Sequence, residues 1–150
     1  MAPGVSDLED HLGYWLRFVS NHVSHAFALK LQAHDVTAAE WVILRELFAR
    51  RNAPSAIAER IGMTRGAVTK LVDRLVAKAL VIREESAGDR RYQVLALTPA
   101  GRRLVPTLAA LADRNDAEFF GHLDAAERAA LDRLLKDVVQ RHGFKTFPTT

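Results

Sequence analysis

The sequence contains no cysteine, and this absence removes several kinds of chemistry at once. A chain without thiols forms no disulfide, offers no thiolate to a metal and has no cysteine with which to sense oxidants. No uncharged apolar run approaches the roughly 18 residues that a membrane-spanning helix needs. The first ten residues also lack the basic start and apolar stretch of a secretion signal. We therefore expect a cytoplasmic protein with no membrane contact.

Motifs of the common enzyme classes are missing as well. The sequence has no glycine-rich phosphate loop, no His-Glu-x-x-His and no Gly-x-Ser-x-Gly. Its carboxylates are spread along the faces of predicted helices, which is typical of solvated surface. We expect neither an enzyme nor a bound cofactor.

The composition is that of one globular domain, and its charge is unevenly distributed. The chain has 150 residues, of which 49% are hydrophobic and 26% charged. Residues 51–103 contain 11 Lys and Arg against 5 Asp and Glu, whereas the remaining segments contain 10 against 13. A basic middle between acidic ends favours a polyanionic partner, such as nucleic acid, for the middle of the chain.

Hydrophobic spacing predicts a mainly helical fold with one short β interruption. A long helix is expected over about 7–33, and a capping box at Thr37 and Glu40 begins a second. A third helix begins at Pro54, with Ser55 free to cap it, and Gly62 ends it. Thr64 caps a fourth helix that is expected to end near Leu80.

The period then changes from helical to alternating. Residues 81–85 and 92–97 read as two strands joined by a polar loop over 86–91 that contains a glycine. Thr98 and Pro99 begin a fifth helix, and a second box-like start at Asp124 and Glu127 begins a sixth.

Residues 54–73 have the spacing of a DNA-binding helix-turn-helix. Two short helices that cross steeply need a small residue at their contact and a glycine at their turn. Ala58 and Gly62 supply these. The inward apolar positions are Ile57, Ile61, Val68 and Leu71. An ordinary corner between two helices remains the alternative on spacing alone.

A basic hairpin directly after a helix-turn-helix is typical of a wing, here over 81–97. The second helix of the motif would enter the major groove while the hairpin tip lies over the adjacent backbone or minor groove. The candidate DNA-binding residues are Thr64, Arg65, Gly66, Thr69, Lys70 and Arg74 on the helix, and Asp89, Arg90 and Arg91 on the wing.

Four stretches of the sequence together resemble the MarR family of bacterial winged helix-turn-helix transcription regulators. They are Leu71-Val-Asp-Arg-Leu75, Ala79-Leu-Val-Ile-Arg83, Asp89-Arg-Arg91 and Leu95-Ala-Leu-Thr-Pro-Ala-Gly101, within a resemblance that covers about 8–141. The resemblance implies a dimer that binds DNA. It also implies that Asp89 buttresses an arginine and that Arg91 is directed toward the minor groove.

The predicted organisation is a single domain over 1–150, with helical dimerisation arms at 8–33 and 99–141 around a DNA-binding lobe at 37–98. Large apolar residues crowd both ends of the chain, and a monomer of this size has little core to cover them. They are Leu12, Leu16, Phe119, Phe120, Leu123, Phe144 and Phe147. A two-fold homodimer would read a palindromic operator whose half-sites lie about 34–36 Å apart. Packing of these residues within one chain is the alternative.

A small aromatic or phenolic ligand is the effector that the resemblance implies, in a crevice between arms and lobe. An apolar slot with one or two polar anchors is usual for such a pocket. The candidate lining residues are Trp15, Phe18, His22 and His25 on the first helix, and Trp41 and Arg45 on the second. The alternative is that these residues serve only packing.

The overall hypothesis is a homodimeric repressor of a palindromic operator that is relieved by such a ligand. That the protein represses transcription is inferred from the resemblance to the family and not from any particular residue. Two alternatives stay open: a winged-helix protein-interaction module without operator binding, and a metal-responsive regulator using His22 and His25. The other histidines are scattered, so no metal site is predicted.

Overall fold

The computed structural model describes residues 4–86 and 89–146, and the side chains of these residues outside 86–92. The elements in chain order are a 3₁₀ turn (Leu8–Asp10), α1 (Leu12–Gln32), α2 (Ala38–Ala49), α3 (Pro54–Ile61), α4 (Arg65–Ala77), β1 (Val81–Ser86), β2 (Asp89–Leu97), α5 (Pro99–Phe120) and α6 (Ala125–His142). The predicted fold class, mainly helical with one hairpin, is confirmed.

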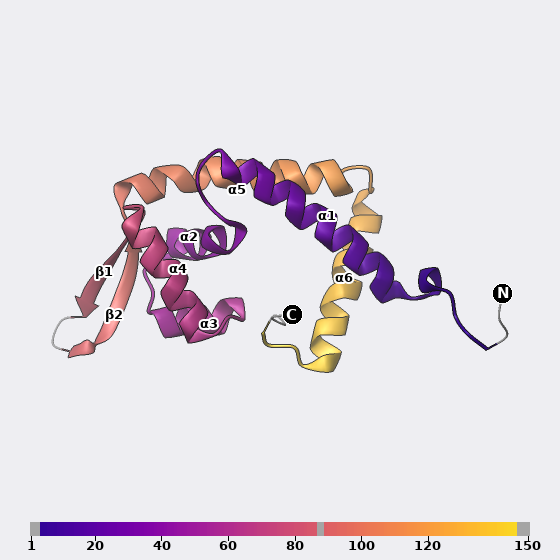
Figure 1. The fold of residues 1–150 in the computed structure, drawn as a ribbon, viewed down its shortest axis with the longest axis horizontal. Coiled ribbons are helices and arrows are strands. Elements are labelled where there is room, and N and C mark those ends of the chain that lie inside the picture. The colour runs from indigo at the N-terminus through magenta and orange to yellow at the C-terminus, as the bar shows by residue number, and fades with distance from the viewer. Residues whose placement is uncertain (1–3, 87–88, 147–150) are drawn as a thin grey trace.

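The elements form two parts (Figure 1). We call α1, α5 and α6 the arm, and α2, α3, α4, β1 and β2 the lobe. In the arm α1 and α5 pack side by side, and the lobe lies under the end of α5 that follows the hairpin. Helix α6 turns away from the far end of α5 and runs back toward α3, so the last described residues lie near the lobe.

Local sequence signals begin and end most of the helices as predicted. Both capping boxes form, at Thr37 with Glu40 and at Asp124 with Glu127. Gly62 ends α3 in the left-handed conformation at φ 72°. Such a conformation carries a steric cost for residues that have a Cβ.

Two helix starts differ from the prediction. Helix α1 begins at Leu12, and a separate 3₁₀ turn precedes it. The Trp15 indole N–H donates a hydrogen bond to the carbonyl oxygen of Glu9 in this turn (3.0 Å). Ser55 does not cap α3: Ala53 is the cap residue and Pro54 occupies the first turn. The proline fixes a helical φ there and has no N–H that needs a partner.

One hydrophobic core joins the lobe to the arm. Its fully buried side chains come from α1, α2, α3, α4, both strands and α5: Leu31, Ile43, Leu44, Leu47, Ile57, Val68, Val72, Leu75, Val81, Leu95, Val105 and Leu108. Helix α6 contributes none of the buried core residues in the described part of the chain. The lobe is therefore fixed to α1 and α5 by packing, whereas α6 leaves much of its apolar surface open.

The hairpin is antiparallel, with Val81 opposite Leu97 and Glu85 opposite Gln93. Its second strand begins at Asp89, three residues before the predicted start, so the connection is shorter than expected. Asn52 pairs with Leu95 in an isolated bridge on the other edge of β2, through hydrogen bonds of 2.8 and 3.2 Å. The base of the hairpin is thus bonded to the chain segment that leads into α3.

Candidate nucleic-acid interface

The α3–α4 unit has the geometry of a helix-turn-helix. After Gly62 the backbone N–H of Met63 donates to the Ala58 carbonyl, and the Thr64 hydroxyl caps α4 by accepting from the backbone of Ala67 (3.1 Å). The six positions predicted from spacing take up the expected roles: Ile57, Ala58, Val68 and Leu71 are buried, Ile61 is half-buried and Gly62 makes the turn. A Cβ at Gly62 would lie 2.7 Å from the Lys145 carbonyl oxygen. The turn therefore requires glycine for two independent reasons.

One face of α4 is exposed and basic. Arg65, Gly66, Thr69, Lys70 and Arg74 are all exposed, as the spacing predicted, and Thr64 stands exposed at the start of the helix. The Thr69 hydroxyl donates to the Arg65 carbonyl at 2.9 Å, which leaves its oxygen able to accept from a partner.

The cations of this face differ from several other cations of the lobe, which form ion pairs. Within the part of the chain whose side chains are described, Arg65, Lys70 and Arg74 form no ion pair. By contrast, Arg51 pairs with Glu84 at 2.7 Å, and Arg60 with Glu46 at 2.6 Å. A row of exposed cations that have no ion-pair partner among the described side chains is available to a polyanion.

Ion pairs join β1 to this helix and to the segment that leads into α3. Arg83 of β1 pairs with Asp73 of α4, and Glu84 of the same strand pairs with Arg51. The backbone of Asp89, Arg90 and Arg91 begins β2, but their side chains lie outside the described part of the structure. The roles expected of these three side chains stay predictions.

A buried ion pair behind α4 was missed by the sequence analysis. Lys78, the C-cap of α4, donates to Glu40 Oε1 at 3.1 Å, and the Glu40 side chain is fully buried. Burial acts to raise the pKa of Glu40, but hydrogen bonds from Thr37 and Lys78 and the charge of Lys78 together hold that pKa below its usual value. Thirty-eight residues separate the partners. A lysine in the last turn of one helix and a glutamate in the first turn of another carried no sequence signal that they would meet.

The arm has an open apolar face. Exposed large side chains line α1 and α6: Leu12, Trp15, Leu16, Phe18, Val19, Leu131, Leu134, Leu135, Val138 and Val139. Between these helices lies a groove of about 500 Å³, lined by Leu12, Trp15, Leu16, Val19, Ser20, Val23, Ser24, Phe120, Leu131 and Leu135. No helix in the described residues is long and apolar enough to cross a membrane. Exposed apolar faces of this kind are typical of surfaces that bind another protein, a ligand or a membrane.

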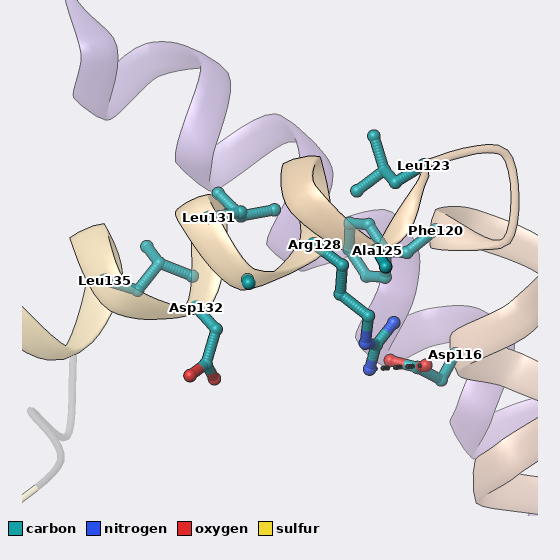
Figure 2. A pocket seen from close by; sticks show the side chains of 9 residues that line it. Asp116, Phe120, Leu123, Ala125, Arg128, Leu131, Asp132 and Leu135 are labelled. Atoms are coloured by element: carbon teal, nitrogen blue, oxygen red, sulfur yellow. Dashed lines mark ion pairs between the residues drawn. The ribbon is translucent and has the colours of Figure 1, made fainter.

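A second pocket, of about 460 Å³, opens at the corner between α5 and α6 (Figure 2). Phe120, Leu131 and Leu135 contribute apolar surface to its wall. On the other side Arg128 reaches toward Asp116, and these two side chains form an ion pair at 2.8 Å. Because Phe120, Leu131 and Leu135 also line the groove, the two cavities share a wall.

The six predicted ligand residues lie in different parts of the described structure. The aromatic side chains of α1 form a ladder, with Trp15 and Phe18 at 6.5 Å between ring centroids and His22 stacked on Phe18 at 5.0 Å. His25 is exposed, Trp41 packs against the core, and the Arg45 guanidinium lies over the Phe48 ring at 5.8 Å. Of the three main pockets in the described residues, one includes Trp15, and none includes the other five.

His22 and His25 are the residues on which the metal-responsive alternative depends. The described residues contain no group of three or more His, Asp or Glu side chains placed to hold a metal ion. The structure therefore provides no observation that favours the metal-responsive alternative.

A helix-turn-helix with an exposed basic second helix, followed at once by a hairpin bonded to that helix, defines the chain as a winged helix-turn-helix protein. A model of the MarR family matches residues 34–91. The transcriptional repressor NicR of Pseudomonas putida is 30% identical over 138 residues, which cover 89% of this chain and 85% of NicR. A curated relative from Thauera aromatica is 35% identical over 82 residues, and the match spans 49% of that protein's length.

Solved structures agree with these sequence matches. BpsR of Bordetella bronchiseptica, whose DNA binding is described as regulated by 6-hydroxynicotinic acid, has a TM-score of 0.81 and 26% identity, over 90% of this chain and 97% of BpsR. A cysteine-to-serine variant of MarR from E. coli, in complex with operator DNA, has a TM-score of 0.79 and 29% identity, over 89% of this chain and 99% of that one. The chain belongs to the MarR family: it is a DNA-binding transcription regulator and not an enzyme.

Proposed function

We propose that the protein is a homodimeric repressor that acts in the cytoplasm on a palindromic operator and is released by a small aromatic acid. The observation that carries the proposal is the exposed basic face of α4 beside the hairpin, whose cations form no ion pair among the described side chains. Arg65 lies in the first turn of α4, where a side chain of a recognition helix points into the major groove. Its guanidinium suits bidentate contact with guanine, while Lys70 and Arg74 suit contact with phosphates.

A second copy of the chain is the occupant that we propose for the apolar face of the arm. The exposed side chains are large and continuous along two long helices, and Leu12 is 81% exposed while Leu134 is 57% exposed. A face of this size on an uncovered monomer is unusual. Two copies related by a two-fold axis would present two α4 helices to a palindrome, at half-sites about 34–36 Å apart.

Repression and its relief by a ligand are supported by the relatives. NicR is named a repressor, and regulation of BpsR by 6-hydroxynicotinic acid provides an aromatic acid of the proposed kind. In this chain Trp15, Phe18 and His22 offer ring faces on the arm, and Trp41 with Arg45 offers a ring and a cation on the lobe. Since the three pockets include only Trp15 of these residues, we propose that the site is completed when a second copy covers the arm.

The test combines sequence selection with a measurement of mass. Purified protein is used to select bound duplexes from a random DNA library, and light scattering gives the mass of the free protein. We expect enrichment of an inverted repeat and a mass of two chains. Enrichment of no sequence would instead favour a protein-interaction module.

One variant links the dimer to DNA binding. Val19 lines the groove and is 43% exposed in the single chain, so Val19→Asp would place a charge inside the interface. We expect a monomer that no longer retains the selected operator. Asn21→Asp introduces the same carboxylate at an exposed position that is not among the groove-lining residues, and it should remain dimeric. A dimeric Val19→Asp protein would contradict this placement of the interface.

A further inference from the structure

The C-terminal end of α4 is bonded to the connection between α1 and α2. Lys78 Nζ donates to the Asp35 carbonyl at 2.6 Å and to Glu40 Oε1 at 3.1 Å. Asp35 itself has a left-handed backbone, φ 55°, at the point where the chain leaves α1. One lysine side chain thus joins the helix that faces DNA to the segment through which the first helix of the arm enters the lobe.

The same end of α4 is bonded to the start of α5. The Thr98 hydroxyl donates to the Ala79 carbonyl at 2.7 Å, and the Thr98 N–H donates to the Leu80 carbonyl at 3.0 Å. Gly101 packs so closely that a Cβ there would lie 2.2 Å from the Leu80 oxygen. Residues 78–80 are therefore in contact with both chain segments that connect the arm to the lobe.

The Glu40–Lys78 pair is the charged part of this junction. The Glu40 side chain is fully buried, and its Oε2 has no hydrogen-bond partner in the described part of the chain. A buried carboxylate with one free oxygen depends strongly on the cation bonded to its other oxygen. The pair consequently favours one position of the α4 end relative to the α1–α2 connection over positions in which Lys78 withdraws.

We propose that Lys78 is a positioning residue for operator reading: through Glu40 and Asp35 it fixes the end of α4 to the segment by which the arm enters the lobe, so that the position of this segment sets how Arg65 meets the bases. This inference rests on the proposed reading of DNA by α4. Lys78 lies one helix length from Arg65, about 20 Å for 13 residues, so it acts through the orientation of α4 and not by contact with the same bases. Over this length, a small rotation of α4 about its C-terminal end would displace Arg65 at the N-terminal end of the helix.

The experiment compares Lys78→Met with Lys136→Met in the full-length protein. Methionine keeps most of the side-chain length and removes the charge. Lys136 is an exposed lysine of α6, paired with Asp132, and its replacement makes the same change in net charge. Binding to the selected operator and to a random duplex is titrated at several salt concentrations, at a temperature where thermal melting shows each variant fully folded.

We expect Lys78→Met to lower operator affinity by about five- to fiftyfold, with random-duplex affinity and the salt slope unchanged, a range typical of coupling between sites. Lys136→Met should leave all three quantities unchanged, and Lys78→Arg should restore much of the operator affinity. An equal loss on both duplexes with a salt slope lower by about one would instead make Lys78 a phosphate contact and overturn the proposal. Unchanged operator affinity in a folded Lys78→Met protein would also overturn it.

If the single variant does not fold, the double variant Glu40→Gln, Lys78→Met provides the same readout, because a neutral amide in the core needs no cation. The same selective loss on the operator supports the proposal, and unchanged affinity overturns it. Wild-type protein that binds no duplex would overturn the proposed function, whereas an operator-binding wild type with an unaffected Lys78 variant overturns only the role of Lys78.

Discussion

Asp73 on α4 and Arg83 on β1 form an ion pair that joins the recognition helix to the first strand of the hairpin. Both side chains are in contact with solvent, at 61% and 31% exposed, respectively. Exposed pairs contribute little to folding, typically about 0–1 kcal/mol. The pair is therefore better placed to orient the hairpin than to stabilise the fold.

Asp73→Asn should accordingly loosen the hairpin with little effect on stability. We expect the free energy of unfolding in urea to change by less than about 1 kcal/mol, because the pair is exposed. Hydrogen exchange at the backbone amides of 82–85 should become faster, since β1 loses its side-chain bond to α4. A destabilisation of several kcal/mol, or unchanged exchange, would contradict this role.

Arg65→Ala should affect affinity and sequence preference together. Loss of a bidentate contact with guanine costs about 1–3 kcal/mol and relaxes preference at one position in each half-site. Titration on the selected operator, on single-base variants and on random DNA measures both effects. Arg133→Ala, an exposed arginine of α6, provides the charge-matched control. Equal weakening on every duplex would make Arg65 a phosphate contact.

The wing tip is predicted from the sequence and the family resemblance. Arg91→Ala should weaken operator binding at least as much as Arg90→Ala, because an arginine in a narrow A·T-rich minor groove experiences enhanced negative potential. Asp89→Ala should also weaken binding, although it removes a negative charge, if Asp89 orients Arg91. Tighter binding by Asp89→Ala would show that net charge, and not orientation, dominates at the tip.

Glu40 should make the fold sensitive to acid. The pKa of Glu40 is lowered in the folded protein, so the ionised carboxylate stabilises the fold. This stabilisation of the fold is fully present above the unfolded-state pKa of Glu40 and is lost as the pH falls through its folded-state pKa. Between about pH 5 and pH 3, the wild-type free energy of unfolding should therefore fall more steeply than that of Glu40→Gln. Urea titrations of both proteins across this range measure the difference. Parallel curves would show that Glu40 is not a source of the acid sensitivity.

Salicylate-like aromatic acids should raise the melting temperature of the protein and weaken operator binding. A ligand changes DNA affinity only if it binds one arrangement of arm and lobe better than another. Trp15→Ala and His22→Ala should reduce both effects, since they remove the ends of the aromatic ladder on α1. Tyr14→Ala tests a neighbouring ring whose position was not among the predicted ligand residues. Stabilisation that survives both substitutions would place the ligand elsewhere.

The fold was predictable where its signals are local. Thr37 with Glu40, Asp124 with Glu127, and Gly62 act within three or four residues, so their sequence spacing determines what they bond. The exposed basic face of α4 was predictable for the same reason, because helical periodicity assigns Arg65 and Lys70 to the side opposite Val68.

The prediction was wrong at some local boundaries and missed contacts between distant parts of the chain. Helix α1 was expected from about residue 7, but the chain bends at His11 before α1 begins. The bridge from Asn52 to Leu95 and the pair of Glu40 with Lys78 join residues 43 and 38 positions apart. The packing of helices and strands determines such partners, and the local sequence pattern around each residue does not predict them. The six ligand candidates were chosen for their side-chain chemistry, which does not record how far apart the fold places them, and their role in ligand binding stays a prediction.

The bridge at Asn52 also determines which edges of the hairpin are left open. It occupies part of the outer edge of β2, whereas in the described part of the chain β1 pairs only with β2. Arg83, Glu84 and Glu85 run consecutively along that strand. Charged side chains on a short edge strand oppose the addition of a strand from another molecule. The charged side chains of β1 therefore oppose edge-to-edge aggregation of this two-stranded sheet at high protein concentration.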